Sequence, residues 1–459
     1  MKSKEKVSLN TQISIVAIAL ITFSGILSET SMNVTFNTLQ KVFQTDLGTL
    51  QWITSGYLLA VAITITLGAT LAHNWTERRI LFTAAIGFLV GNAMAALAPN
   101  FAILMCARII QGAATGLAVP LLFNVIVERV PRSQIGLYMG FSGLVISLAP
   151  AIGPTYGGFM IHQFDWHMIF ALILIFPLLS LILGYFFLEN GGPKEPRPFD
   201  LLAFLLLATA LTSAIMAISS LESGQIDWLL LGLFVISLTL FIWRSLRSEK
   251  PFLDIRLLGN PVILLGILPF FIYQFSNLSS NFLLPNYLTM VNHASTTQAG
   301  FALLPGTLLG ALAAPFLGNF YDRFGPKPSL YGGNILFLLA ILALVLFSQQ
   351  LTVTFVIAVY IVFTIGRNMA FNNTMAVSVS NIKSEQTADA TALFQTAQTF
   401  AGALGTAIAA LLVKQAPTME TGANHVFVLL SILVAGNFLF FQQLFRRIRS
   451  QQADKNMVK

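Results

Sequence analysis

The sequence predicts an all-α, polytopic membrane protein, and two observations lead to that fold class. First, 56% of the 459 residues are hydrophobic and only 9% are charged, whereas about 25% are charged in a typical soluble domain. So few charges cannot cover the surface of a soluble chain of this length. Second, apolar segments of about 20 residues, long enough to span a bilayer, recur along the chain. The composition therefore excludes secreted, disordered and ordinary soluble enzymes.

Fourteen apolar segments are expected to cross the bilayer as helices. The seventh and eighth are short, and merging them would leave thirteen segments and separate the two termini. An even number places both termini on the same side of the membrane. The expected segments are 11–36, 48–71, 80–98, 101–128, 134–161, 167–188, 200–220, 228–244, 260–290, 297–321, 328–348, 351–380, 386–413 and 424–445.

The positive charges fall mainly on one side of this topology. With the N-terminus in the cytoplasm, 21 of the 25 Lys and Arg residues lie in inner loops or termini. Only Lys41 and Lys414 lie in outer loops, while Arg108 and Arg367 fall within segments. Because cytoplasmic loops of membrane proteins are enriched in Lys and Arg, both termini are predicted to be cytoplasmic. This bias accounts for the net charge of +7 without nucleic-acid binding.

An internal repeat divides the chain into two halves. A short inner turn at 71–79 follows the second segment, and a similar turn at 318–327 follows the tenth. Each follows the second helix of a six-helix set, and the Gly- and Pro-rich stretch 190–198 is typical of a linker. The predicted parts are an N-terminal six-helix bundle at 1–189, a linker with two extra helices at 190–259, and a C-terminal six-helix bundle with a cytoplasmic tail at 260–459.

Two of the segments carry groups that an apolar helix does not favour. Arg108 costs several kcal/mol in a membrane unless it is partnered or reaches water. It either extends to the outer interface or faces the bundle interior. The fifth segment contains the run from Ala149 to Gly158, with two prolines and three glycines. Neighbouring helices can satisfy the backbone groups that such residues free, so this run predicts a packing kink, a bending point, or both.

These motifs resemble those of the major facilitator superfamily. Arg108, Gln111 and Gly112 are similar to the fourth-helix signature of its transporters. The run from Gly153 to Gly158 resembles the fifth-helix signature of its drug antiporters, and 318–327 looks like its signature loop. The conformational motifs that the resemblance implies comprise Gly153, Pro154, Gly157, Gly158, His73, Arg78, Arg79, Gly318, Asp322, Arg323 and Gly325.

Four further stretches, 51–59, 166–170, 299–306 and 392–406, are similar to the fourteen-helix drug:proton antiporter branch of that superfamily. The resemblance implies two six-helix bundles plus an inserted helix pair. It also implies proton-coupled efflux of lipophilic, cationic compounds by alternating access, with no enzyme activity and no cofactor besides the proton as coupling ion. A cell-membrane location, in a bacterial plasma membrane, follows from the same resemblance.

The chain departs from the family pattern in two places. In the first-half loop, His73 stands where the family has Asp, and Glu77 replaces an Arg. This loop normally closes the cytoplasmic gate through a charge relay, so its role here is open. In the first helix, Glu29 is shifted by one position from the acid of the branch, and Asn37 stands where Pro is usual.

Glu29 is the one acid expected well inside a segment, whereas Asp389 lies near the cytoplasmic start of the thirteenth. Burial disfavours the carboxylate anion, so a deep Glu can exchange a proton near neutral pH. Glu29, with Arg108 and Asp389, is therefore the candidate for proton coupling or cation recognition. The alternative is a structural Glu that bonds to neighbouring helices or pairs with Arg108.

Amide and aromatic side chains recur at helical spacing inside the segments. Gln274, Asn277 and Asn281 form one stripe, and Asn368 and Asn372 share one helix face. Such a lining suits bulky amphipathic molecules, especially lipophilic cations, although each amide can instead bond between helices. The candidate cavity residues are Asn33, Trp52, Tyr57, Gln111, Tyr273, Gln274, Asn277, Asn281, Arg367, Asn368, Asn372, Gln395 and Gln398.

Two other functions would depend on different residues. An acidic cargo, such as a lipid or an anionic metabolite, would make Arg108 and Arg367 the key residues. A membrane enzyme or sensor would need a catalytic cluster, and no His-rich box, metal-spaced cluster or phosphate loop is present. Cys106, the single cysteine, is expected to be a small buried hydrophobe. The expected partners are the bilayer and small amphipathic molecules, and a monomer suffices because one chain contains both halves.

Overall fold

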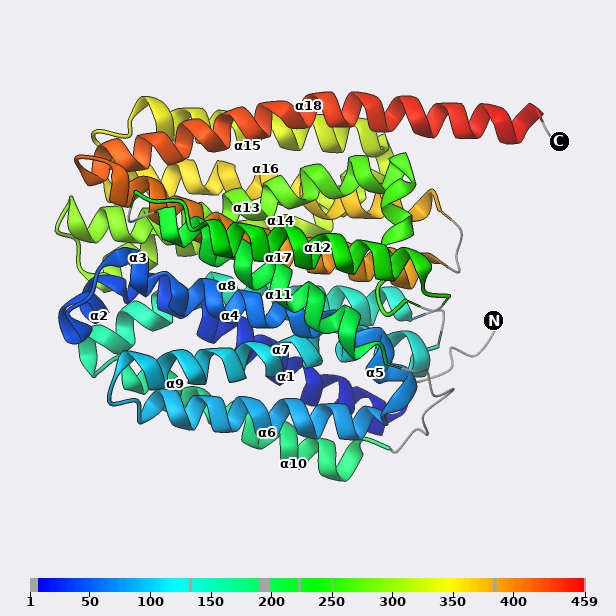
Figure 1. Ribbon diagram of the computed structural model, residues 1–459, viewed down its shortest axis with the longest axis horizontal. Helices are drawn as coiled ribbons and strands as arrows, with labels where there is room; N and C mark the ends of the chain where they lie inside the picture. Colours follow the sequence, from blue (N-terminus) through cyan, green and yellow to red (C-terminus); the bar gives the residue numbers. More distant parts are fainter. Residues whose placement is uncertain are drawn as a thin grey trace. The chain divides into compact units, whose positions relative to one another are not determined.

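The computed structural model describes residues 7–131, 134–189, 199–221, 224–249, 251–382 and 386–457, and helices dominate these residues (Figure 1). Among these described residues, thirteen helical spans are long and apolar enough to cross a membrane. The fifth expected segment corresponds to a further 29-residue helix, Ile135–Gln163, outside that group. The all-α, fourteen-segment fold class expected from the sequence is therefore confirmed.

The helices group into two compact units, which are described separately. The first comprises Met1–Leu201 together with Ser295–Leu304. Its helices begin with Leu9–Ser31, the expected first segment, and alternate between long spans and short connecting turns. They are α1 (Leu9–Ser31), η1 (Met32–Val34), α2 (Phe36–Phe43), α3 (Leu47–Leu50), α4 (Trp52–Ile65), α5 (Gly68–Asn74), α6 (Glu77–Ala96), α7 (Phe101–Arg129), α8 (Ile135–Gln163), α9 (His167–Ile173) and α10 (Ile175–Phe187).

The second unit comprises Leu202–Ala294 and Pro305–Lys459. The extra helix pair expected between the halves clusters with this unit, and α14 contributes its first residues to the first unit. The helices are α11 (Leu201–Ser220), α12 (Trp228–Arg247), η3 (Ile255–Gly259), α13 (Pro261–Met290), α14 (Thr296–Phe324), α15 (Pro326–Leu346), α16 (Val353–Ser380), α17 (Thr387–Gln415) and α18 (Met419–Met457).

Several helices begin where a polar side chain caps the first turn. The Thr76 hydroxyl accepts a hydrogen bond from the Arg79 amide at 3.2 Å, which starts α6. The Asn100 side chain accepts from the Ile103 amide at 3.0 Å, which starts α7. Such caps satisfy backbone donors that have no partner within the helix. They fix the first turn of each helix and thereby the depth of the functional residues that follow.

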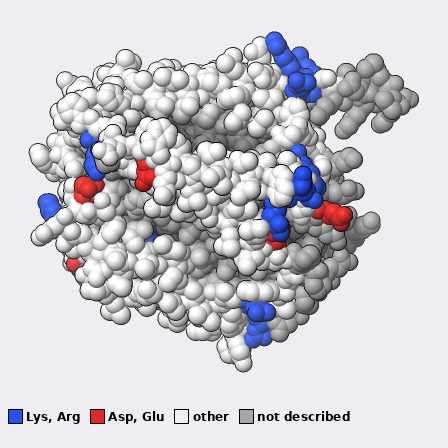
Figure 2. All heavy atoms as spheres, in the orientation of Figure 1, with Lys and Arg blue, Asp and Glu red and all other residues white. Residues whose placement is uncertain are grey.

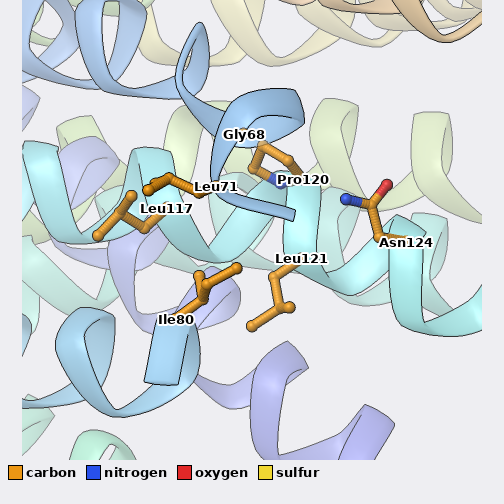
Figure 3. Close-up of a pocket in the computed structure, with 7 residues that line it drawn as sticks. All are labelled: Gly68, Leu71, Ile80, Leu117, Pro120, Leu121 and Asn124. Atoms are coloured by element: carbon orange, nitrogen blue, oxygen red, sulfur yellow. The ribbon is translucent and has the colours of Figure 1, made fainter. Parts of the chain in front are cut away.

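Three expected segments are interrupted, and the first of them, 11–36, changes from α1 to η1 after Ser31. The sixth divides at Leu174 into α9 and α10, because Pro177 lacks an amide proton and its ring crowds the carbonyl of Ile173. The second divides after Ile65 into α4 and α5. At that break Gly68 contacts Pro120 of α7, and a Cβ atom on Gly68 would lie 2.7 Å from the proline ring. Figure 3 shows the small pocket there, lined by Gly68, Leu71, Ile80, Leu117, Pro120, Leu121 and Asn124.

The surface is largely uncharged, as a membrane protein requires. In Figure 2, most atoms on the visible face belong to uncharged residues, and Lys, Arg, Asp and Glu occupy small patches. Within the first unit, Ile18, Leu81 and Leu122 are fully buried and belong to one apolar core between α1, α6 and α7. The prediction for Cys106 is wrong, because its side chain is exposed. The cause is helical geometry, since successive side chains of α7 point about 100° apart.

Candidate functional site

The first functional cluster forms where α7 packs closely on α4. Gly112 and Gly116 lie one turn apart on α7, and their missing side chains let the α4 backbone approach. A Cβ atom at Gly112 would lie 2.9 Å from the Cβ of Ala60, and one at Gly116 would lie 2.9 Å from the Val61 carbonyl. Small residues allow such close approach between membrane helices. Arg108 lies one turn before Gly112 and therefore faces α4 as well.

Arg108 is fully buried and is held by hydrogen bonds from three directions. Its Nε donates to the Ile53 carbonyl at 3.0 Å. Its Nη1 donates to the Ser28 hydroxyl at 2.9 Å and to the Gln111 side-chain oxygen at 2.6 Å. Among the described residues its Nη2 has no partner. The sequence left two positions open for this cation, and the structure places it in the bundle interior.

An aromatic ring and a hydroxyl chain complete this cluster. The Arg108 guanidinium lies over the Tyr57 ring, 4.2 Å from its centroid, which is favourable for a cation. The hydroxyls of Tyr57 and Thr115 are 2.8 Å apart, and Thr115 donates to the Gln111 carbonyl at 3.0 Å. Gln111 and Tyr57, both candidates from the sequence, are therefore brought together with Arg108.

Asn33 and Trp52 belong to the same unit as Arg108. Asn33 is buried, and its side-chain oxygen accepts a hydrogen bond from Thr54 at 3.3 Å. Trp52 is half-buried at the start of α4. Asn33 thus joins η1 to α4, so its amide bonds between helices. Trp52 keeps an accessible face.

Glu29 lies in the last turns of α1, directly after Ser28, and its side chain is buried at 9% exposure. Among the described residues it forms no hydrogen bond and no ion pair, and its neighbour Ser28 accepts a hydrogen bond from Arg108 at 2.9 Å. The structure thus brings a buried acid and a buried cation into one cluster without joining them directly.

Two glycines of the fifth-helix motif contact α1 at the turn that carries Glu29. A Cβ atom at Gly153 would lie 2.8 Å from the Cβ of Thr30, and one at Gly157 would lie 3.0 Å from the Ser31 Cα. Any larger residue at either position would push α8 away from α1. The motif therefore brings the α8 backbone next to the Glu29 turn.

The neighbouring glycine of the same motif contacts α14. A Cβ atom at Gly158 would lie 2.5 Å from the Thr296 carbonyl, and one at Gly300 would lie 2.6 Å from the Pro154 carbonyl carbon. The Thr297 hydroxyl also donates to the Gly158 carbonyl at 3.1 Å. The motif thus packs on α1 through one face and on the first turn of α14 through another.

The second functional cluster contains Arg367 on α16. Its Nη2 donates to the Gln274 side-chain oxygen at 2.5 Å, and its Nη1 donates to the Asn368 side-chain oxygen at 3.2 Å. The guanidinium lies 4.3 Å from the centroid of the Phe371 ring. The structure therefore joins three of the candidate cavity residues, each of which is half-buried.

The other candidates of the second unit differ in their surroundings. Tyr273 is fully buried, and its hydroxyl donates to the Asn334 side chain at 2.6 Å. Asn281 accepts a hydrogen bond from the Tyr360 hydroxyl. Both therefore bond between helices. Asn372 is exposed, whereas the remaining three candidates are half-buried: Asn277, Gln395 and Gln398.

The loop motifs are only partly described. The side chains of His73 and Asp322 lie outside the described residues. Arg78 donates to the Tyr185 carbonyl at 3.1 Å, and Arg79 lies 4.2 Å from the Trp75 ring centroid. Both cations therefore contact neighbours at the start of α6.

In the second-half loop, Gly325 has φ = 83°, a left-handed conformation that favours glycine. It precedes Pro326 at the start of α15. Arg323 is exposed, and a Cβ atom at Gly318 would meet nothing within 4 Å. Asp389 is half-buried in the first turn of α17. These positions define turns and helix ends rather than one cluster.

Sequence reasoning missed several partners of these clusters. The Ile53 carbonyl carries no sequence signal, because any residue supplies a backbone oxygen. Ser28 stands next to Glu29, and Thr115 lies four residues after Gln111, a spacing that places them on one helix face. Glu77, noted only as a departure from the family, forms an ion pair with Arg129.

Comparison with known proteins identifies the family of this sequence. The sequence matches the Major Facilitator Superfamily over residues 18–406. It is 33% identical over 430 residues to the lincomycin resistance protein LmrB of Listeria innocua, covering 91% of each chain. It is 32% identical over 405 residues to LmrB of Bacillus subtilis, covering 86% of this chain and 84% of that one.

A solved structure shows the same fold. The crystal structure of a POT family transporter in complex with a thioalcohol-conjugated peptide superposes with a TM-score of 0.71 at 16% identity, covering 94% of this chain and 96% of that one. At this identity the likeness concerns the fold alone. Taken with the match across most of the sequence, it leads to one conclusion: this chain belongs to the Major Facilitator Superfamily and is a membrane transporter, not an enzyme.

Proposed function

We propose that this transporter exports lipophilic, cationic drugs from the cell in exchange for protons, by alternating access. The observation that carries the proposal is Glu29, a buried acid without a fixed partner beside a buried Arg108. Its protonated form is neutral and tolerates a low dielectric, whereas its ionised form attracts a cation. Substrate and proton would therefore compete for the same carboxyl group.

The contacts of α8 suggest how this exchange is linked to a change of conformation. Gly153 and Gly157 pack on the α1 turn that follows Glu29, and Gly158 packs on the outer end of α14. A shift of α1 on protonation would therefore reach α14 through α8. In secondary transporters of this kind, helices move largely as rigid bodies around a fixed site.

The names of two similar proteins indicate which class of substrate to expect. Two of them are named for resistance to lincomycin, a basic amine that carries a sugar. An amine is a cation at neutral pH, which matches a site with one buried carboxylate. We propose a bacterial plasma-membrane location with both termini in the cytoplasm, supported by the positive-inside bias of the sequence. One chain contains both six-helix sets, so we expect a monomer to be functional.

The proposal is tested with purified protein in liposomes under an imposed pH gradient. The uptake of a fluorescent lipophilic cation is compared between wild type, Glu29→Gln and Glu189→Gln. Glu189 is the matched control, because its side chain is 72% exposed at the end of α10. We expect wild type and Glu189→Gln to move the dye against its gradient and Glu29→Gln to lose this ability.

A second measurement separates coupling from binding. Exchange of labelled for unlabelled dye without a pH gradient needs binding and alternation but no net proton movement. We expect Glu29→Gln to retain exchange at high dye concentration, with a weaker apparent affinity because the carboxylate is gone, while it loses uphill transport. Equal uphill transport by wild type and Glu29→Gln would remove Glu29 from the mechanism and make Asp389 the next acid to test. If no protein responds to the gradient, an anionic or lipid cargo replaces the cation.

A further inference from the structure

We propose that Arg367, Gln274 and Asn368 form a hydrogen-bonding subsite for the oxygen atoms of a substrate, such as the hydroxyl, ether and carbonyl groups of a glycoside. The inference rests on the proposed export function, and the subsite lies within the second unit. It starts from a cation that the proton-coupling mechanism does not use.

Two helices build this subsite, and each supplies one polar and one aromatic side chain. On α13, Phe270 and Gln274 lie four residues apart, and on α16, Arg367 and Phe371 do the same, so each pair shares one helix face. The rings of Phe270 and Phe371 stack with centroids 4.0 Å apart and planes inclined by 8°. Arg367 lies over Phe371 and reaches across to Gln274. The guanidinium is therefore held in place before any ligand binds.

The arginine retains unused hydrogen-bonding capacity. A guanidinium carries five N–H donors, and within the described residues Arg367 makes two hydrogen bonds, to Gln274 and Asn368. Its Nε is buried and has no partner. Leaving a buried donor of a charged group unsatisfied costs free energy. A ligand oxygen at this point would recover that cost.

Two amide side chains without protein partners lie on α13 and on α17, which packs against it. Asn277 follows Gln274 by three residues on α13, and Gln395 follows Phe394, whose ring meets Phe270 edge to face at 5.1 Å. In the part of the chain that the structure describes, neither side chain makes a hydrogen bond, and both are half-buried. Amides supply donors and acceptors without charge, which suits hydroxyl and ether oxygens.

The charge of this cluster decides which part of a substrate it accepts. No carboxylate forms an ion pair with Arg367 among the described residues. An ammonium group would be repelled by the guanidinium, whereas an oxygen acceptor would be attracted. The subsite therefore suits the oxygen-rich part of a substrate and not its cationic part.

The test measures binding of two probes to the full-length protein in nanodiscs by equilibrium dialysis. Lincomycin carries an amine, an amide and a sugar, whereas tetraphenylphosphonium is a lipophilic cation without oxygen. The variants are Arg367→Gln, Arg367→Lys and the control Arg447→Gln, which removes an exposed arginine of α18. We expect Arg367→Gln to raise the Kd for lincomycin by about tenfold or more and to change the Kd for tetraphenylphosphonium less than twofold.

The two remaining variants sharpen the result. Arg367→Lys keeps the charge but loses the planar fork, so we expect a smaller loss of lincomycin affinity than in Arg367→Gln. Arg447→Gln should bind both probes as wild type does. Unchanged lincomycin binding in Arg367→Gln, or an equal loss for both probes, would overturn the subsite. A wild-type protein that binds neither probe would refute the proposed function itself and the subsite with it.

Discussion

Glu77, the first residue of α6, forms an ion pair with Arg129, the last residue of α7. The same guanidinium donates a hydrogen bond to the Glu189 carbonyl at 2.9 Å, which follows α10. One arginine thus joins the start of α6, the end of α7 and the chain just after α10. Where the family pattern has an arginine, this chain has Glu77, which forms an ion pair within the first unit.

Removal of this ion pair should destabilise the protein. Both side chains are about one-sixth exposed, at 16% and 17%, so the pair is shielded from water more than an ordinary surface pair. We expect Glu77→Gln to lower the free energy of unfolding by about 1–2 kcal/mol, because Arg129 keeps its charge and loses its partner. Thermal unfolding in detergent, with Glu77→Gln, Arg129→Gln and the double variant, gives the coupling free energy.

Glu189→Gln is the control for that cycle. Its carboxylate lies 4.0 Å from Arg129 and is 72% exposed. We therefore expect a change in stability of less than about 0.5 kcal/mol. Additive effects of Glu77→Gln and Arg129→Gln would show that the pair contributes nothing.

Arg108 should resist even conservative replacement. A lysine cannot reproduce the planar fork that donates to Ile53, Ser28 and Gln111 at once. We expect Arg108→Lys to abolish transport and to lower the free energy of unfolding by about 2–3 kcal/mol. Ser28→Ala, which removes one acceptor, should cost about 1 kcal/mol. Vesicle transport and thermal unfolding measure the two effects, and an active Arg108→Lys protein would contradict the expectation.

A larger residue at Gly158 should separate α8 from α14. In Gly158→Val the new Cβ atom would lie 2.5 Å from the Thr296 carbonyl, so one helix must shift. We expect a loss of about 1–3 kcal/mol in stability and a lower rate of dye exchange. The control is Gly232→Ala on α12, where a Cβ atom meets nothing within 4 Å. That variant should be more stable by about 0.5–1 kcal/mol, because alanine favours the helix.

Tyr273 should contribute to stability rather than to substrate binding. Its hydroxyl donates to Asn334, and its ring packs on Phe337 with centroids 5.3 Å apart. We expect Tyr273→Phe to lower the free energy of unfolding by about 1 kcal/mol and to leave the Kd for either probe within twofold. A selective loss of binding without a loss of stability would contradict this expectation and support a role for Tyr273 in substrate binding.

The sequence predicts a residue's depth in a segment better than its direction. Arg108 could be placed inside a segment because a buried cation is rare and costly. Tyr273 and Gln274 are adjacent in sequence, yet they point about 100° apart on α13 and reach different neighbours. Their surroundings depend on which helices pack on each face, and a single sequence does not contain that information.

Helix ends and breaks followed a similar rule. Pro177 lies in an apolar run, and the break at Leu174 follows from its chemistry. The break between α4 and α5 involves Gly68 and its contact with Pro120, 52 residues later. Contacts between residues that are distant in sequence set such features. Accordingly the fourteen segments could be predicted, but not the partners of Arg108 or the Glu77–Arg129 pair.

The exposed side chain of Cys106 offers a natural attachment site for a spectroscopic probe. It is the one cysteine in the sequence and lies within a candidate membrane span, so a membrane-permeant thiol-reactive label would attach at a single site without any engineered background. The site lies two residues before Arg108 on α7, on a face that turns away from the buried guanidinium. A probe there would report movement of that helix during turnover, and Cys106→Ser would supply the unlabelled reference.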